Sequence, residues 1–482
     1  MRELFLRGFL HTAVGKYSRF AITLLVAAIL SRLLTPMDYG TVALVSVIAA
    51  FADVLVDAGL GPAVIQNKTL DADDNTAIFW FSAALSAVVA LVFGACGWLL
   101  ELFYGGAVYR EVTWLLAGSV FTYGLSIVPR ALLTKEKNFR DVNLILVAGS
   151  FAGGAVGVTT ALLGVGVFAL PLQSITSGLV SLGLYFARSP LRVRRLWSLG
   201  AVRKVWGFAS WQWAFSLVNY FTRNLDSLLV GKLLGPTALG HYNKSYNLMM
   251  QPNQLLMGVI LPVMHPILSD YQNDVATVRR AFLRIVRVLG LVGLPLSVFC
   301  ALSSREIIFS LYGDQWGDAV FPFSVLAWSI WAQMTLSPAG AVYMARGRTR
   351  AFFLVGLGSG AFIIAMLCVG LAWGGIDQVA IALTIAFTAQ WPVLYAVMAH
   401  LVLESTLREI VRQLCRPALV ALISAMPLLA LNWLLPDWNV FACLGIKLAT
   451  WGLFYLAGAV LLREHRVILD LLRKPGPDRI AP

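Results

Sequence analysis

Residues 31–40 read SRLLTPMDYG, and residues 231–240 read GKLLGPTALG. A basic residue, two leucines, a proline and a glycine thus return after two hundred positions. The same offset pairs further residues on both sides, namely Leu25 with Leu225, Leu55 with Leu255 and Pro62 with Pro262. Because one offset without gaps relates all these matches, the chain contains a duplication.

The composition places this chain in a membrane. Hydrophobic residues make up 59% of the sequence, charged residues make up 13%, and the mean hydropathy is +0.78. Such a chain has too few polar groups to cover a soluble globule. We predict an all-α polytopic membrane protein with about fourteen transmembrane helices, because an α-helix needs about twenty apolar residues to cross the hydrocarbon core. The spans are expected near residues 14–34, 40–66, 76–100, 112–132, 142–163, 167–187, 205–230, 240–265, 285–302, 320–343, 352–373, 376–398, 417–435 and 442–462.

The net charge of +13 is a topology signal. With the N-terminus in the cytoplasm, most of the 37 lysines and arginines fall in cytoplasmic loops, and the longest basic loop covers residues 188–204. Loops rich in lysine and arginine stay in the cytoplasm. We therefore expect both termini in the cytoplasm and no nucleic-acid partner.

The duplication and the topology together predict two lobes. The second copy begins six crossings after the first, so both copies enter the membrane in the same direction, and transporters place their substrate between such parallel halves. We expect an N-terminal six-helix lobe at 1–187, the basic cytoplasmic linker at 188–204, a C-terminal six-helix lobe at 205–400, and two extra transmembrane helices with a cytoplasmic tail at 401–482. The two lobes are expected to surround a central cavity.

The repeated segment itself is expected to form an outer hinge in each lobe. Pro36 and Pro236 would each end a first helix, and Gly40 and Gly240 would each begin a second one. Proline and glycine at these points favour a tight turn, about which the two helices can swing as a pair.

Four stretches resemble a known family. They are LSRLLTPMDYG (30–40), DVLVDAGLGPAVIQ (53–66), VPRALLTKEKNFR (128–140) and LLVGKLLGPTALGHYNKSYNLMMQP (228–252). They look like the polysaccharide-transporter (Wzx-type flippase) branch of the multidrug/oligosaccharidyl-lipid/polysaccharide exporter superfamily, and the likeness covers roughly the first four hundred residues.

The resemblance implies a flippase of the bacterial inner membrane. Such a protein moves undecaprenyl-pyrophosphate-linked oligosaccharide, the repeat unit of exopolysaccharide, capsule or O-antigen, to the outer leaflet by alternating access. Membrane lipids are the other expected partners, together with a polysaccharide polymerase and a chain-length regulator. A drug/cation antiporter of the same superfamily and a membrane polysaccharide polymerase or glycosyltransferase are the alternatives.

Two aspartates are candidates for ion coupling. Asp53 and Asp57 are four residues apart and share one helix face, and carboxylates inside the bilayer are costly enough to be functional candidates. Two neighbouring carboxylates disfavour simultaneous ionisation, which suits a group that takes up and releases a proton. Asp226 is a third candidate. Pairing with a basic residue of a neighbouring helix is the alternative role.

Two arginines inside helices are candidates for the lipid pyrophosphate, because a guanidinium offers a charged fork of donors to a phosphate. These are Arg19 and Arg223. The duplication aligns Arg19 with Asn219, which is a further candidate for binding the substrate in the cavity. The alternatives are snorkelling of Arg19 to the cytoplasmic headgroups and pairing of Arg223 with Asp226 on one helix.

The eighth helix opens with unusually polar residues, HYNKSYNLMMQPNQ (241–254). Side-chain amides both donate and accept hydrogen bonds, and a lysine ammonium donates. Such groups suit sugar hydroxyls, so Lys244, Asn247, Gln251 and Asn253 are candidates to line the cavity. Trp211, Gln212 and Trp213 are further candidates. Interhelical hydrogen bonding and interfacial anchoring of the tryptophans are the alternatives.

The sequence carries no enzyme signature. The five cysteines are scattered and form no CxxC pair, so we expect neither a metal site nor a disulfide framework. Asp71 and Asp73 form a DxD in a short loop, where a solvated turn is the favoured reading, and no HExxH, nucleophile elbow or phosphate-binding glycine loop is present. We predict a transporter with no cofactor and no catalytic residue.

Overall fold

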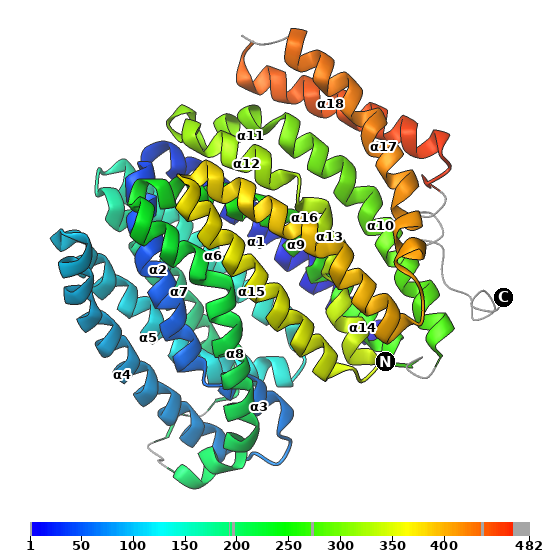
Figure 1. Cartoon of the computed structure of the whole chain (residues 1–482). Coiled ribbons are helices and arrows are strands. Elements are labelled where there is room, and N and C mark those ends of the chain that lie inside the picture. The colour runs from blue at the N-terminus through cyan, green and yellow to red at the C-terminus, as the bar shows by residue number, and fades with distance from the viewer. Residues whose placement is uncertain (1, 192, 195–197, 271–273, 435–437, 466–482) are drawn as a thin grey trace. The chain divides into compact units, whose positions relative to one another are not determined.

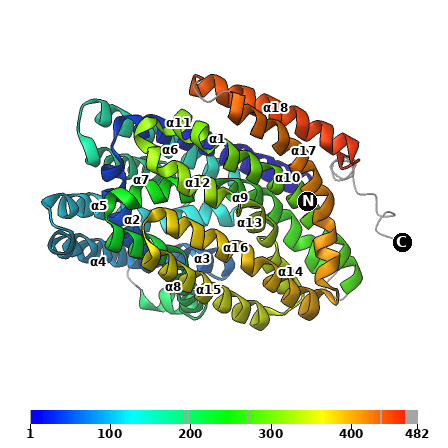
Figure 2. The ribbon, with the colours of Figure 1, turned by 45° about the horizontal axis from the view of Figure 1, so that its top comes forward.

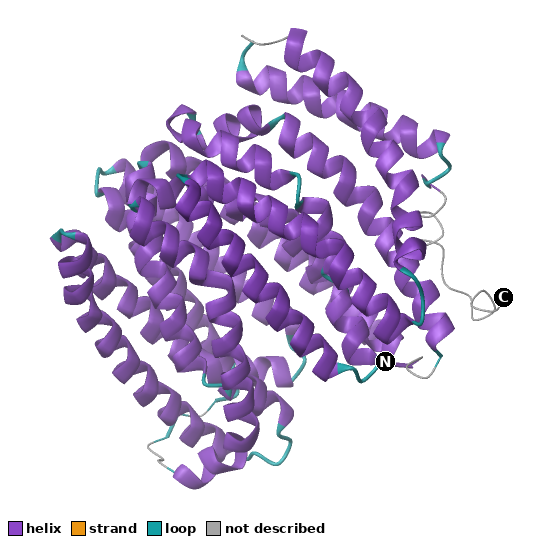
Figure 3. Ribbon diagram, viewed as in Figure 1, coloured by secondary structure: helices purple, strands orange, loops and turns teal. Residues whose placement is uncertain are grey.

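The computed structural model describes residues 2–191, 193–194, 198–270, 274–434 and 438–465. The side chains of residues 2–13, 199, 208, 211, 214–215, 218–219, 221–223, 258–270 and 349 also lie outside the description. Helices account for nearly all of the described residues, and these contain no strand (Figure 3). The predicted all-α class is confirmed.

The chain divides into two compact units, Met1–Gly240 and His241–Pro482. Figure 1 follows it by colour. Unit 1 holds α1 (Arg2–Leu33), α2 (Pro36–Asp57), α3 (Leu60–Gln66), α4 (Ala72–Tyr104), α5 (Ala107–Lys135), α6 (Phe139–Leu162), α7 (Ala169–Arg188), α8 (Leu199–Leu234) and the first turn of α9 (Pro236–Asp270). Unit 2 holds the rest of α9, α10 (Val275–Leu302), α11 (Ser304–Tyr312), α12 (Val320–Ala327), α13 (Ile330–Leu336), α14 (Ala339–Ala345), α15 (Thr349–Trp373), α16 (Ile376–Met398), α17 (Leu407–Leu434) and α18 (Val440–Leu461).

Among the described residues, eleven helices are long and apolar enough to cross a membrane, and a bent pair at Asp314–Ala327 and Ile330–Ala345 raises the number to as many as twelve. The predicted span 320–343 is thus broken, with an angle of 49° between its parts. The predicted spans 205–230 and 240–265 fall on α8 and α9, where part of the side chains lie outside the description. The figure of fourteen stays a prediction.

Consecutive helices pack against each other within each unit, α4 against α5 and α6 against α7 in unit 1, and α15 against α16 and α17 against α18 in unit 2. In unit 2, α17 also packs against α10, which is distant in sequence. Figures 1 and 2 show α4 beside α5 and α17 beside α18 from two directions. The buried core of unit 2 includes Phe282, Trp391 and Tyr395, and the Tyr395 hydroxyl donates to the Thr335 carbonyl at 2.6 Å.

Helix α8 packs on α2, α3 and α4 of unit 1. By the sequence duplication, the same helix is the counterpart of α1 and opens the second copy. Contacts and duplication therefore group α8 differently, and the lobe limits at 1–187 and 205–400 stay a sequence-based proposal.

The repeated segment begins helices in both copies. Pro36 is the first residue of α2 and Pro236 is the first residue of α9, so the expectation that these prolines end the preceding helices is wrong. Proline suits the first helical position because the N–H that it lacks would have no partner there. A capping box completes the start of α2, since Thr35 accepts from the Asp38 N–H at 3.2 Å and Asp38 accepts from the Thr35 N–H at 2.9 Å.

The two copies cross each other at their glycines. A Cβ on Gly40 would collide with the carbonyl oxygen of Pro236, and a Cβ on Gly240 would collide with the carbonyl oxygen of Pro36. The first turns of α2 and α9 therefore approach so closely that only glycine fits at either position. The glycines lie inside the first turns as contact points, and the expectation that they begin the helices is wrong.

Candidate functional site

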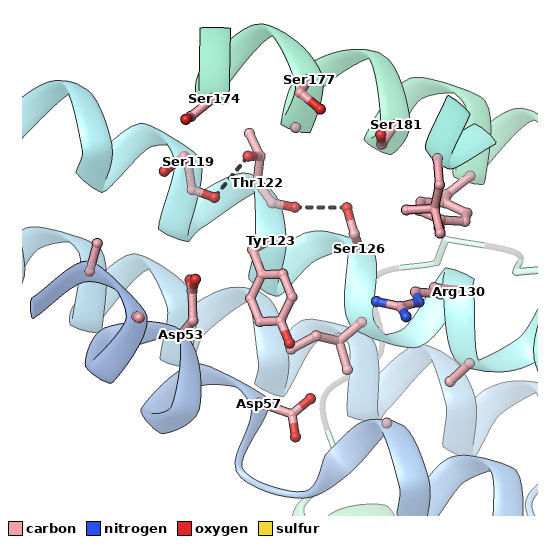
Figure 4. Close-up of a pocket in the computed structure, with 18 of the residues that line it drawn as sticks. Asp53, Asp57, Ser119, Thr122, Tyr123, Ser126, Arg130, Ser174, Ser177 and Ser181 are labelled. Atoms are coloured by element: carbon pink, nitrogen blue, oxygen red, sulfur yellow. Dashed lines mark hydrogen bonds between the residues drawn. The ribbon is translucent and has the colours of Figure 1, made fainter. Parts of the chain in front are cut away.

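A cavity of about 690 Å³ lies within unit 1. Helices α2, α3, α5 and α7 supply nearly all of its wall, and all four belong to predicted membrane-spanning segments. Its polar lining residues are Ser46, Asp53, Asp57, Ser119, Thr122, Tyr123, Ser126, Arg130, Thr134, Ser174, Ser177, Ser181 and Tyr185. Figure 4 shows the carboxylates on one wall and the α7 serines on the opposite one.

The acidic wall comes from α2. Asp53 and Asp57 are one helical turn apart, and both line the cavity, as their spacing predicts. One carboxylate oxygen of Asp53, Oδ1, is buried and has no hydrogen-bond partner among the described residues. The Asp57 carboxylate accepts from the backbone N–H of Gly59. A buried acceptor without a donor is costly, so Asp53 favours the arrival of a proton or another positive group.

A ladder of hydroxyl groups on α5 forms a second wall. Ser119 donates to the Leu116 carbonyl at 2.7 Å, Thr122 to the Ser119 carbonyl at 2.9 Å, and Ser126 to the Thr122 carbonyl at 2.8 Å. Since each hydroxyl proton is used within the helix, the lone pairs remain for the cavity. This wall therefore offers acceptors, which suit cations and the donating hydroxyls of sugars.

One basic residue lines the cavity. Arg130 lies one turn beyond Ser126 on α5, and its guanidinium makes no hydrogen bond or ion pair with any described residue. Its charge acts on Asp57 across the cavity, and Figure 4 shows it on the same wall as Tyr123. A guanidinium with free donors inside a membrane segment is a candidate for binding an anion.

The membrane span that carries the acidic pair is interrupted beside it. Pro36–Gln66 forms one apolar span of 31 residues, but α2 ends at Asp57 and α3 begins at Leu60. Between them Ala58 has a φ of 43° and Gly59 a φ of 69°. A left-handed alanine costs about 1–2 kcal/mol, and broken helices in transporters commonly mark a binding site.

Of the remaining charged candidates on α1 and α8, Arg19 and Asp226 have described side chains. Arg19 is exposed, is not among the cavity-lining residues, and donates through Nε to the Ser150 hydroxyl at 3.2 Å. The side chains of Asn219, Arg223 and Trp211 lie outside the described residues. Asp226 accepts from the backbone N–H of Ser227 at 2.7 Å.

The polar residues of α9 fall in unit 2. Lys244 is buried, with its ammonium 4.5 Å from the ring centre of Tyr312 and 5.1 Å from that of Trp316. Asn253 accepts from the Ser337 hydroxyl at 2.7 Å, which is the predicted interhelical alternative. Asn247 is exposed and Gln251 is half-buried.

The acidic loop before α4 has a capping and pairing role. Asp71 accepts from the Asp74 N–H at 2.6 Å and so caps α4. Asp74 forms an ion pair of 2.7 Å with Lys204 at the start of α8. The hydrogen bond with Asp74 raises the pKa of Lys204 above its ordinary value. The DxD residue Asp71 thus stabilises a helix start.

Sequence reasoning found the acidic pair and missed the rest of the cavity. The hydroxyl ladder was detectable, because Ser119, Thr122, Ser126 and Arg130 recur at the three- and four-residue spacing that places them on one helix face. The break at Ala58 was not detectable, since alanine favours a continuous helix.

A model of the polysaccharide biosynthesis protein family matches residues 29–321 of the chain. Lipopolysaccharide biosynthesis protein WzxC of Escherichia coli (strain K12) is 24% identical over 434 residues, which cover 88% of this chain and 86% of that protein. Succinoglycan biosynthesis transport protein ExoT of Rhizobium meliloti (strain 1021) is 23% identical over 321 residues, covering 66% of this chain and 64% of that protein.

Two solved structures share the fold. The lipid II flippase MurJ in an inward closed conformation superimposes with a TM-score of 0.76 at 13% identity, covering 96% of this chain and 99% of that one. An inward-facing multidrug resistance MATE family transporter superimposes with a TM-score of 0.61 at 14% identity, covering 79% of this chain and 96% of that one.

Proposed function

Because the chain belongs to the polysaccharide biosynthesis protein family, we propose that it is a flippase for a lipid-linked oligosaccharide. It moves an undecaprenyl-pyrophosphate-linked repeat unit from the cytoplasmic to the outer leaflet of a bacterial inner membrane by alternating access. The observation that carries the proposal is the cavity of unit 1, where two carboxylates, an arginine and a set of hydroxyls meet inside membrane-spanning helices. Charged groups are expensive in a bilayer, and where they line an interior cavity they mark substrate or ion pathways.

Asp53 and Asp57 carry the ion coupling in this proposal. The hydroxyl ladder and the two carboxylates present acceptors, so a proton or a cation is the ligand that this wall favours. Asp53 Oδ1 has no hydrogen-bond partner among the described residues, so a proton or cation that enters the cavity can form a favourable interaction with it. Asp226 stays a third candidate on α8.

Substrate contacts are proposed for the basic and amide groups. Arg130 joins Arg19 and Arg223 as a candidate partner of the pyrophosphate, since each can present a charged fork to phosphate oxygens. Asn219, Lys244, Asn247, Gln251 and Asn253 stay proposed partners of the sugar. The protein acts without a cofactor or a catalytic residue, with both termini in the cytoplasm, and delivers its product to a polysaccharide polymerase and a chain-length regulator.

A drug/cation antiporter is the second candidate function, favoured by one observation. The MATE transporter shares the fold, and an acceptor-rich cavity with two carboxylates also suits an organic cation. Arg130 opposes this interpretation, because its guanidinium has no ion-pair partner among the described residues and a fixed positive charge repels such a substrate.

The test measures the lipid-linked oligosaccharide that accumulates on the cytoplasmic leaflet of cells lacking their own flippase. Asp53→Asn, Asp57→Asn and Arg130→Ala should each slow export at least about tenfold, the effect of losing one charged hydrogen bond. Asp73→Asn, an exposed carboxylate in the first turn of α4, is the matched control and should export at the parent rate. Parent-like export by all three cavity variants would refute the proposal, and drug resistance conferred by the parent would favour the antiporter.

A further inference from the structure

Two interactions hold the break between α2 and α3. The first involves Asp57, a cavity-lining residue whose carboxylate accepts from the Gly59 N–H. The second is at the Val54 carbonyl, which accepts from the Ala58 N–H at 3.4 Å and from the indole N–H of Trp213 at 3.1 Å. Trp213 belongs to α8, so a residue of another helix caps the carbonyl at the break.

Helix α8 also touches the break through backbone. A Cβ on Gly59 would lie 2.9 Å from the Cα of Ala209, and Ala209 is fully buried. Glycine therefore serves two needs here, the left-handed φ of 69° and the close approach of α8. Because the approach is backbone to backbone, the break and α8 cannot shift independently.

The contacts of α8 with this region continue toward the first residue of α8. Near its start, Lys204 pairs with Asp74 at 2.7 Å, and the Lys204 carbonyl accepts from the Asn67 side chain at 3.3 Å. Asn67 directly follows α3. The short helix after the break is thus bound to α8 at both ends.

We propose that Trp213 is a positioning residue for Asp57, and that the tie from Trp213 to Val54 couples the state of this carboxylate to the seating of α8. The inference rests on the proposed role of Asp57 in ion coupling. A proton or cation at Asp57 weakens its charge-assisted hydrogen bond to the Gly59 N–H. The break is then held mainly by the hydrogen bond from Trp213 of α8 to the Val54 carbonyl. By reciprocity, release of α8 changes the affinity of Asp57 for its ligand.

A purely structural role for Trp213 makes a different prediction. If the indole only anchors α8 to α2, its loss loosens the packing by the same factor whatever the state of Asp57. A double-mutant cycle separates the two roles, because independent contacts multiply their effects and coupled contacts do not.

The experiment follows the accessibility of α3 in the full-length protein. In a variant whose five native cysteines are replaced, Ile65→Cys places one thiol on α3, at a residue that lines the cavity. A membrane-impermeant maleimide applied to inside-out vesicles then reports the opening of the break as a labelling rate. The rate is measured for the parent, Asp57→Asn, Trp213→Phe and the double variant.

We expect Asp57→Asn and Trp213→Phe each to raise the labelling rate about 3- to 10-fold, the factor that one ordinary hydrogen bond supplies. In the Trp213→Phe background, the Asp57→Asn effect should fall below about twofold, since Asp57 is then no longer held in position to accept from the Gly59 N–H. Trp451→Phe is the matched control, because its indole also donates to a backbone carbonyl, that of Pro295 at 3.2 Å in unit 2. It should leave both the rate and the Asp57→Asn effect unchanged.

An equal Asp57→Asn effect in both backgrounds would overturn the inference. Should Trp213→Phe fail to fold, Gly59→Ala displaces α8 with the indole intact and should abolish the Asp57→Asn effect in the same way. Labelling needs no lipid-linked substrate, so the two proposals fail separately. If the double-mutant cycle shows coupling but Asp57→Asn exports at the parent rate, the coupling between Trp213 and Asp57 stands and Asp57 has no role in export. If Asp57→Asn slows export but the cycle shows no coupling, only the coupling is refuted.

Discussion

A methyl group at either glycine of the α2–α9 crossing should destabilise the protein. On Gly40 it would lie 3.1 Å from the Cα of Pro236 and closer still to its carbonyl, and on Gly240 it would lie 3.1 Å from the carbonyl carbon of Pro36. The obstacles are backbone atoms, so no side chain can turn aside and the helices must separate. Overpacking of this kind costs about 1–3 kcal/mol, and alanine returns about 0.5–1 kcal/mol through helix propensity, which leaves a net loss of up to about 2.5 kcal/mol.

The assay is thermal unfolding of the purified full-length chain in detergent. Gly183→Ala is the control, because this glycine lies inside α7 with nothing within 4 Å of a Cβ, so the same substitution should raise the melting temperature there. Gly40→Ala with Gly240→Ala should cost less than the sum of the single losses, since either methyl already separates the same two turns. If both variants melt at or above the temperature of Gly183→Ala, the close crossing is refuted.

Three further outcomes are expected. Lys447→Met should cost about 3–5 kcal/mol by leaving Glu306 without its 2.7 Å partner, and Glu306→Gln in the same chain should restore most of the loss in a melting assay. The pKa of Lys204 is raised by its hydrogen bond with Asp74. Lys204 therefore contributes stability that is complete below its ordinary pKa of 10.5 and is lost as pH rises through the higher pKa of the folded state. Asp74→Asn should remove this alkaline step from a plot of melting temperature against pH, and an unchanged step would exclude the ion pair as its cause. Arg130→Lys should retain part of the export that Arg130→Ala loses, because the charge survives without the fork, and equal loss in both would show that charge alone is insufficient.

The sequence contained enough to predict the fold class and one wall of the cavity. Mean hydropathy and span length fix a helical membrane protein, and helical periodicity places Asp53 and Asp57 together. The position of each charged side chain in the fold and its hydrogen-bond partners could not be predicted, because they depend on which helices pack against each other. Arg19 was expected in a cavity, and the structure shows that its Nε donates to the Ser150 hydroxyl on α6. Arg130, which the sequence did not single out, lines the cavity of unit 1.

The break at Ala58 illustrates why part of the site escaped prediction. A left-handed alanine is unfavourable locally, so no propensity argument assigns a helix end there. The energy that permits it comes from distant residues, among them Trp213, which lies 159 positions from Val54 in the sequence. Such sites are set by tertiary contacts that override local preference.

The crossing explains why the chain repeats SRLLTPMDYG as GKLLGPTALG. Each copy supplies one proline carbonyl and one glycine, and each glycine lies under the carbonyl of the other copy. A contact that maps onto itself when its partners are exchanged requires the same residue on both sides, so a duplication provides both halves at once. Translation of the first turn of α2 along the first turn of α9 would push the Gly40 and Gly240 Cα atoms into the facing backbone. Rotation about the point between the two glycines keeps the contacts of Gly40 with the Pro236 carbonyl and of Gly240 with the Pro36 carbonyl. We therefore expect the first turns at residues 36–40 and 236–240 to act as a pivot during transport, and a disulfide that fixes the angle between these two turns should stop export without unfolding the protein.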